Sequence, residues 1–110
     1  MEQQKDIKTI ISHYGNDLQK QVAIEEMAEL TKEICKTFRG APNMSNIIEE
    51  IVDVQLMLMQ LIVMFGLDES YINYYVKGKI ERTLAQIDKE SKINAASEKK
   101  HEQLTLFKMR

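Results

Sequence analysis

The spacing of apolar residues along the chain predicts helices and no strands. Ile7, Ile10 and Ile11 share one side of a short helix over about residues 5–13. A second helix, over about residues 18–38, has apolar positions at helical period: Ile24, Met27, Ala28, Thr31, Ile34, Cys35 and Phe38. We expect this second stripe to pack in the core.

The pattern continues with two longer helices. Asn46 followed by Glu49 has the spacing of a capping box and predicts a third helix to about residue 65. A fourth helix is predicted over about residues 69–92, with an apolar stripe of Ile72, Val76, Ile80, Leu84 and Ile87. Residues 1–92 would then form an all-α helical domain. The polar residues 93–110 would form a tail, either mobile or docked on a partner subunit.

The third predicted helix is apolar on nearly every side between Leu56 and Phe65. A helix that is hydrophobic all round is buried on all sides, and three other helices from so short a chain can hardly cover it. We therefore expect a second subunit. The apolar stretch over residues 54–65 is shorter than the roughly 20 residues that span a bilayer, so no membrane is expected.

Composition narrows the class of protein further. A chain of 110 residues makes one domain, and its net charge of −2 does not indicate a basic nucleic-acid surface. The first residues contain no apolar signal region, and the single cysteine, Cys35, fits a reducing compartment. We expect a cytoplasmic protein in which Cys35 is an inert core thiol.

Two acidic motifs carry the candidate chemistry. Residues 25–29 read Glu-Glu-Met-Ala-Glu and residues 49–53 read Glu-Glu-Ile-Val-Asp. Glu26 and Glu29 are three residues apart, as are Glu50 and Asp53, so on a helix each pair projects from one face. Four carboxylates brought together raise one another's pKa values unless a cation joins them. Hard oxygen ligands of this kind suit Mg²⁺, and Mn²⁺ as a second possibility.

Two other interpretations of the acids are weaker. As solvated surface acids, Glu49 and Glu50 would be favoured by the dipole at the helix amino terminus, but Asp53 lies on the inward apolar stripe, where an unpaired carboxylate is costly. A di-iron helical bundle needs Glu-x-x-His pairs, and neither His13 nor His101 follows a glutamate at that spacing. An all-oxygen site for a hard cation remains.

The motif of Glu25, Glu26 and Glu29 followed by that of Glu50 and Asp53 resembles the signature of the all-α nucleoside triphosphate pyrophosphohydrolases. That superfamily includes MazG, the dimeric dUTPases and phosphoribosyl-ATP pyrophosphohydrolase. The sequence around both motifs is most similar to small single-domain MazG-like proteins of bacteria and phages, and the resemblance covers about residues 10–90. It implies a four-helix MazG-like bundle completed by dimerisation or higher assembly.

The resemblance also implies an activity and a set of ligands. Water would attack the α-phosphorus of a nucleoside triphosphate and release a monophosphate and pyrophosphate. The Mg²⁺ ligands carry over to Glu26, Glu29, Glu50 and Asp53. Glu25 would orient the attacking water or an outer ligand.

Basic and amide side chains are candidates for substrate binding. Lys79 and Arg82, on the fourth predicted helix, resemble the basic pair that follows the second acidic motif in the family, although such residues are often solvated at a stripe edge. Lys36 and Arg39 close the second helix, where compensation of the helix dipole explains them equally well. Gln19 has the donor and acceptor groups to read a base edge, or is simply solvated.

Together these features predict an Mg²⁺-dependent nucleotide pyrophosphohydrolase that forms a homodimer or homotetramer. A more specialised enzyme for dUTP, dCTP or phosphoribosyl-ATP is an alternative. A helical module that binds nucleotides without hydrolysing them is another.

Overall fold

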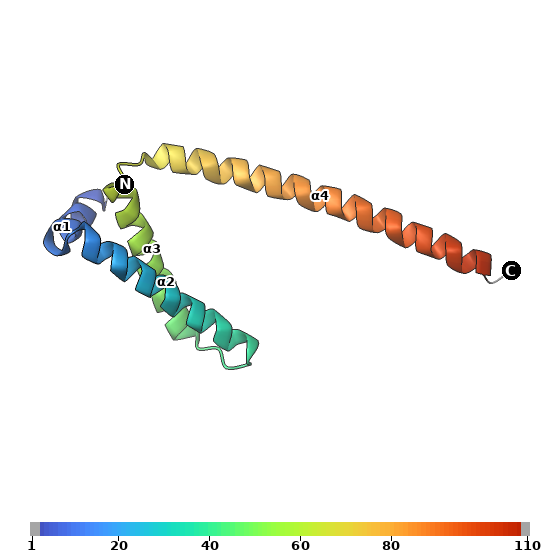
Figure 1. The fold of residues 1–110 in the computed structure, drawn as a ribbon, viewed down its shortest axis with the longest axis horizontal. Coiled ribbons are helices and arrows are strands. Elements are labelled where there is room, and N and C mark those ends of the chain that lie inside the picture. Colours follow the sequence, from blue (N-terminus) through green and yellow to red (C-terminus); the bar gives the residue numbers. More distant parts are fainter. Residues whose placement is uncertain (1–2, 109–110) are drawn as a thin grey trace. The chain divides into compact units, whose positions relative to one another are not determined.

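The computed structural model describes residues 3–108, and within them every regular element is a helix. The helices are α1 (Gln4–Tyr14), α2 (Asn16–Phe38), α3 (Met44–Met64) and α4 (Glu69–Lys108) (Figure 1). The all-α class predicted from the sequence is confirmed. The chain divides into one compact unit that holds α1 to α3 and ends at Glu69, and a second unit that begins at Ser70.

Pairing of α2 with α3 builds the first unit, and α1 contacts both helices. Buried Gln19, near the start of α2, donates a hydrogen bond of 2.7 Å from Nε2 to Oε1 of buried Gln60, near the end of α3. The two helices are therefore antiparallel, and residues 39–43 join them (Figure 1). Ile7 of α1, Ala23 of α2 and Met57 of α3 form the small apolar core.

The apolar stripe predicted for α2 is not the side that α2 buries. Ile24, Ile34 and Phe38 are exposed, Phe38 to 86%, and the Cys35 thiol is exposed as well. The buried residues of α2 are instead Gln19, Ala23 and Glu33. The expectation of a core stripe and of an inert core thiol was wrong for the single chain, because the side of α2 that faces α3 is rich in polar residues.

The start of α3 lies slightly earlier than predicted. Asn43, rather than Asn46, is the N-cap, and its side-chain oxygen accepts a hydrogen bond of 3.1 Å from the backbone N–H of Asn46. A side-chain acceptor of this kind satisfies one of the amides that the first helical turn leaves without a partner. Burial of α3 is also partial, because Met57 and Gln60 are its only buried residues.

The fourth helix is longer than predicted. We expected it to end near residue 92, yet α4 continues to Lys108. Most of the polar segment predicted as a tail is therefore helical. Apolar side chains along α4, among them Ile80, Leu84 and Ile87, are exposed within the chain.

No single helix in the described part of the chain is long and apolar enough to cross a membrane. The pair α3 and α4, taken together across the break between them, meets that test by length and composition only.

The core position of Ile7 generates a stability prediction. Ile7 is 2% exposed, so Ile7→Ala leaves a cavity among α1, α2 and α3. We expect this substitution to lower the free energy of unfolding by about 2–4 kcal/mol, as measured by urea denaturation. The matched change Ile93→Ala, at an exposed position of α4, should have little effect. Equal losses in the two variants would contradict the assigned core.

Candidate metal site

Three of the predicted acids converge where α2 crosses the first half of α3. Glu26 of α2 and Glu50 and Asp53 of α3 each offer a carboxylate oxygen, and these oxygens lie within 4.8 Å of one another. We call these three residues the acidic triad. All three side chains are only partly buried, so the triad remains open to a ligand.

The register of the helix pair explains the convergence. Glu26 follows Gln19 by seven residues and Asp53 precedes Gln60 by seven residues, so both lie two turns from the glutamine pair in antiparallel helices. Glu50 is one turn before Asp53 on the same face of α3. The hydrogen bond between the glutamines thus sets the register of the two helices, and this register brings the acids together.

Electrostatic repulsion within the triad is not relieved by nearby cations. The pKa of Glu26 is raised above its ordinary value of 4.5, first by desolvation, then by the charges of Asp53 and Glu50, and further by hydrogen bonds with their carboxyl groups. Of the lysines and arginines whose side chains the structure describes, none forms an ion pair with the triad. The negative charge is therefore uncompensated.

A buried oxygen adds to this evidence. Oε2 of Glu50 is inaccessible to solvent and has no hydrogen-bond partner. A buried polar atom without a partner carries a desolvation penalty and calls for an explanation. A bound cation would supply the partner for this oxygen.

The spacing of the triad fits one hard cation. Two oxygens that bind the same Mg²⁺, each at about 2.0–2.1 Å, are at most about 4.2 Å apart, whereas two oxygens on Ca²⁺ can be about 5 Å apart. The triad oxygens lie within 4.8 Å of one another, a bound that fits Ca²⁺ directly, and Mg²⁺ would draw them to within its shorter limit. Mg²⁺ commonly retains other positions for water and phosphate oxygens, and the partial exposure of the triad leaves room for them.

The remaining predicted acids lie outside the triad. Glu25 and Glu29 are exposed. Glu29 shares the motif spacing, but it lies outside the covered side of α2, where Ala23 and Glu33 are buried and Glu26 and Leu30 are half-buried. Its assignment as a fourth ligand therefore stays a prediction.

The predicted substrate-binding residues occupy different environments. Gln19 is buried and its amide donates to Gln60 inside the helix pair, so that donor is not displayed to a ligand. Arg39 is exposed at the C-cap of α2. Lys79 and Arg82 are exposed on α4, in the second unit.

Sequence reasoning missed Glu33, which is 5% exposed. Its Oε1 accepts a hydrogen bond of 2.9 Å from Nζ of Lys36, whereas its buried Oε2 has no partner. The signal was present in the sequence, because Glu33 follows Glu26 by seven residues and so lies on the same face of α2.

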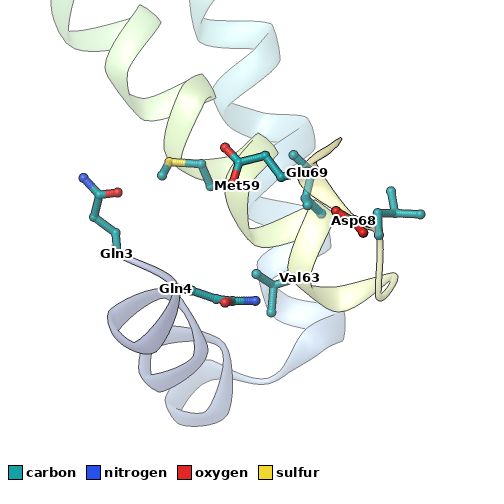
Figure 2. A pocket seen from close by; sticks show the side chains of 8 residues that line it. Gln3, Gln4, Met59, Val63, Asp68 and Glu69 are labelled. Atoms are coloured by element: carbon teal, nitrogen blue, oxygen red, sulfur yellow. The ribbon is translucent and has the colours of Figure 1, made fainter. Parts of the chain in front are cut away.

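A separate cavity lies at the other end of the first unit, near the start of α1 and the end of α3. Its volume is about 520 Å³, and its lining combines aliphatic side chains with amides and carboxylates: Gln3, Gln4, Met59, Ile62, Val63, Leu67, Asp68 and Glu69 (Figure 2). None of the triad residues lines it.

The raised pKa of Glu26 generates a pH prediction for the protein in a chelator. A carboxyl whose pKa is raised by folding destabilises the folded state once the pH exceeds the ordinary value of 4.5 and the group is forced to ionise. Stability should therefore fall as the pH rises from 4.5 through the raised pKa.

Urea denaturation in EDTA across this range would measure the effect. Glu26→Gln should flatten the pH profile, whereas Glu25→Gln, at the exposed neighbour, should leave it unchanged. If Glu26→Gln had the same pH profile as the wild type, ionisation of Glu26 would not destabilise the folded state.

Comparisons of the chain with models of protein families, with curated proteins and with solved structures find no match.

Proposed function

We propose that the protein is an Mg²⁺-dependent nucleoside triphosphate pyrophosphohydrolase of the MazG-like type. The observation that carries the proposal is the convergence of Glu26, Glu50 and Asp53 from two antiparallel helices. These residues occupy three positions of the two acidic motifs that resemble that superfamily. Their uncompensated charge and the partnerless oxygen of Glu50 support a cation at this place.

The proposed reaction is a hydrolysis at the α-phosphorus. The oxygen of water bonds to the α-phosphorus, the bond from that phosphorus to the bridging oxygen breaks, and pyrophosphate leaves. The water proton passes to a carboxylate or to solvent. Bound Mg²⁺, with Mn²⁺ as a substitute, would neutralise charge on the phosphates and lower the pKa of water.

The residues of the chain have distinct roles in this proposal. The acidic triad holds the cation, and exposed Glu25, next to Glu26, orients the attacking water. Lys79 and Arg82, on α4 of the second unit, stay predicted substrate-binding residues. Cytoplasmic nucleotides would be the substrates, and the base they carry is left open.

One observation favours a second candidate function. Only three carboxylates converge, and Glu29 is exposed outside the triad. A site with three acids could bind a nucleotide together with its cation and not hydrolyse it. Such a nucleotide-binding module is distinguished from the enzyme by the fate of the bound triphosphate.

Asp53→Asn tests the proposal, because it keeps the shape of the side chain and removes one anionic ligand. Metal stabilisation of a phosphoryl reaction amounts to several kcal/mol, so we expect turnover to fall by at least about 100-fold. The assay measures pyrophosphate release from a panel of canonical and modified triphosphates with Mg²⁺. Asp17→Asn, at an exposed position of the same helix pair, is the control.

The outcomes of this assay separate the candidates. Monophosphate and pyrophosphate from the wild type support the enzyme, provided that Asp53→Asn loses activity. Intact triphosphate that is nevertheless bound in the presence of Mg²⁺ supports the binding module. Normal turnover in Asp53→Asn would remove the triad from the reaction.

We also propose that the protein is a homodimer or homotetramer. The single chain leaves large apolar side chains of α2 and α3 exposed: Ile24, Met27, Ile34, Phe38, Ile48, Ile51, Val52, Leu56 and Leu58. A soluble monomer rarely exposes a contiguous apolar surface on this scale. A second copy of the same helix pair would cover it with a matching apolar surface.

Light scattering tests the assembly. At micromolar concentration we expect a mass at least twice that of the 12.8 kDa chain. The double change Ile51→Glu and Leu58→Glu places two charges on the exposed apolar side of α3 and should give a monomer or an unfolded chain. Ser12→Glu adds a charge at an exposed polar position of α1, outside α2 and α3, and should leave the mass unchanged. A wild-type monomer would contradict the proposal.

A further inference from the structure

We propose that Lys36, held in place by Glu33, binds the terminal phosphate of the nucleoside triphosphate. The triphosphate would then lie along the α2–α3 pair, with its γ-phosphate toward the loop over residues 39–43. This inference rests on the proposed function, and it adds a positioning residue and a direction of binding to it.

The ion pair between these residues is built into the helix interface. Nζ of Lys36 lies 2.9 Å from Oε1 of Glu33, and the Glu33 side chain is 7% exposed against 30% for that of Lys36. The carboxylate is thus enclosed while part of the lysine side chain still reaches solvent. This arrangement fixes a cation at the edge of the interface, where an anionic ligand could meet it.

Stability alone does not explain the burial of Glu33. Solvent-exposed ion pairs three residues apart on a helix contribute little to the free energy of unfolding. Burial of the carboxylate adds a desolvation penalty, which lowers that free energy further. Oε2 of Glu33 remains without a hydrogen-bond partner. In addition, Glu33 lies near the carboxyl end of α2, where the helix dipole disfavours an anion. Compensation of that dipole accounts for Lys36 but not for the buried glutamate that holds it.

The position of the pair relative to the acidic triad fits a triphosphate. Glu33 follows Glu26 by seven residues on the same face of α2, a rise of roughly 10 Å. Because Lys36 reaches back to Glu33, its ammonium group lies near the level of Glu33 along the helix. The α- and γ-phosphorus atoms of an extended triphosphate are about 6 Å apart, and the contacts at its two ends, of about 2 Å to a cation at the triad and about 3 Å to the Lys36 ammonium, make up the rest of this distance.

Positive side chains lie near the 39–43 loop at one end of the helix pair. The antiparallel arrangement places the amino terminus of α3, at Met44, at the same end as Lys36 and Arg39. Amide groups at a helix amino terminus attract anions, and these two side chains add positive charge. The opposite end holds the amino terminus of α2 and Lys20 as well as the neutral pair of Gln19 and Gln60, so the helix dipoles do not select an end. The direction follows from the position of Lys36 between the acidic triad and the 39–43 loop.

The test compares ligands with and without a γ-phosphate. The probes are the α,β-methylene analogues of the four canonical deoxynucleoside triphosphates and of the matching diphosphates, with Mg²⁺, and calorimetry gives their affinities for the full chain. Lys36→Met should weaken triphosphate binding about tenfold or more, the effect of a lost hydrogen bond between charged groups. Diphosphate binding should change less than about twofold, since the γ-phosphate is absent.

Matched variants separate this role from a structural one. Lys32→Met removes a lysine from an exposed position of α2 and should preserve the preference for triphosphate. Lys36→Arg keeps the charge and should retain most of that preference. Glu33→Gln removes the anion that holds the lysine and leaves the lysine in place, so the preference for triphosphate should fall by a smaller factor. Because the substitution also removes a buried charge whose Oε2 has no partner, the thermal unfolding midpoint should be maintained or raised.

The failures of the two proposals are distinguishable. If the wild type binds the triphosphate analogues and Lys36→Met weakens both ligand classes equally, or neither, the assignment of Lys36 to the γ-phosphate is overturned and the proposed function survives. If the wild type binds no nucleotide analogue with Mg²⁺, the proposed function fails, and this inference fails with it.

Discussion

Polar pairing between α2 and α3 is the constraint on which the rest of the first unit depends. Along their shared face the two helices place amides and carboxylates, with the bond between Gln19 and Gln60 at one end and Glu33 at the other. Hydrogen bonds in a low-dielectric interface have strict geometry, and a polar group left without a partner there is unfavourable. The glutamine pair therefore fixes the register, and the register brings Glu26 opposite Asp53.

This pairing has an energetic consequence for the whole chain. A face that holds like charges contributes less to stability than an apolar one, and the described core contains only three buried hydrophobic residues: Ile7, Ala23 and Met57. Anything that binds the folded state alone stabilises it by mass action. A cation at the triad and a second copy against the exposed apolar residues are two such contributions, and both belong to the function that we propose.

The faces of the helices could be predicted from the sequence only in part. The helical period of the sequence predicted an apolar stripe along α2. We assumed that this stripe would face the core of its own chain, but Ile24, Ile34 and Phe38 are exposed. That assumption holds when a helix packs against its own chain through its one apolar side. Here α2 packs on α3 through a different side, which a heptad-spaced series of Gln19, Glu26 and Glu33 marks in the sequence.

The sequence by itself determined the all-α class, the order of the four helices and the two acidic motifs, because helical period, capping residues and glycine positions act locally. It also predicted that Asp53 would lie on the inward side of its helix, and in the structure Asp53 is half-buried and lies close to Glu26 of α2. Only the tertiary structure decided which acids meet, because that depends on the register between two helices rather than on spacing within one. Register brought Glu50 and Asp53 to Glu26, left Glu29 exposed, and enclosed Glu33 beside Lys36.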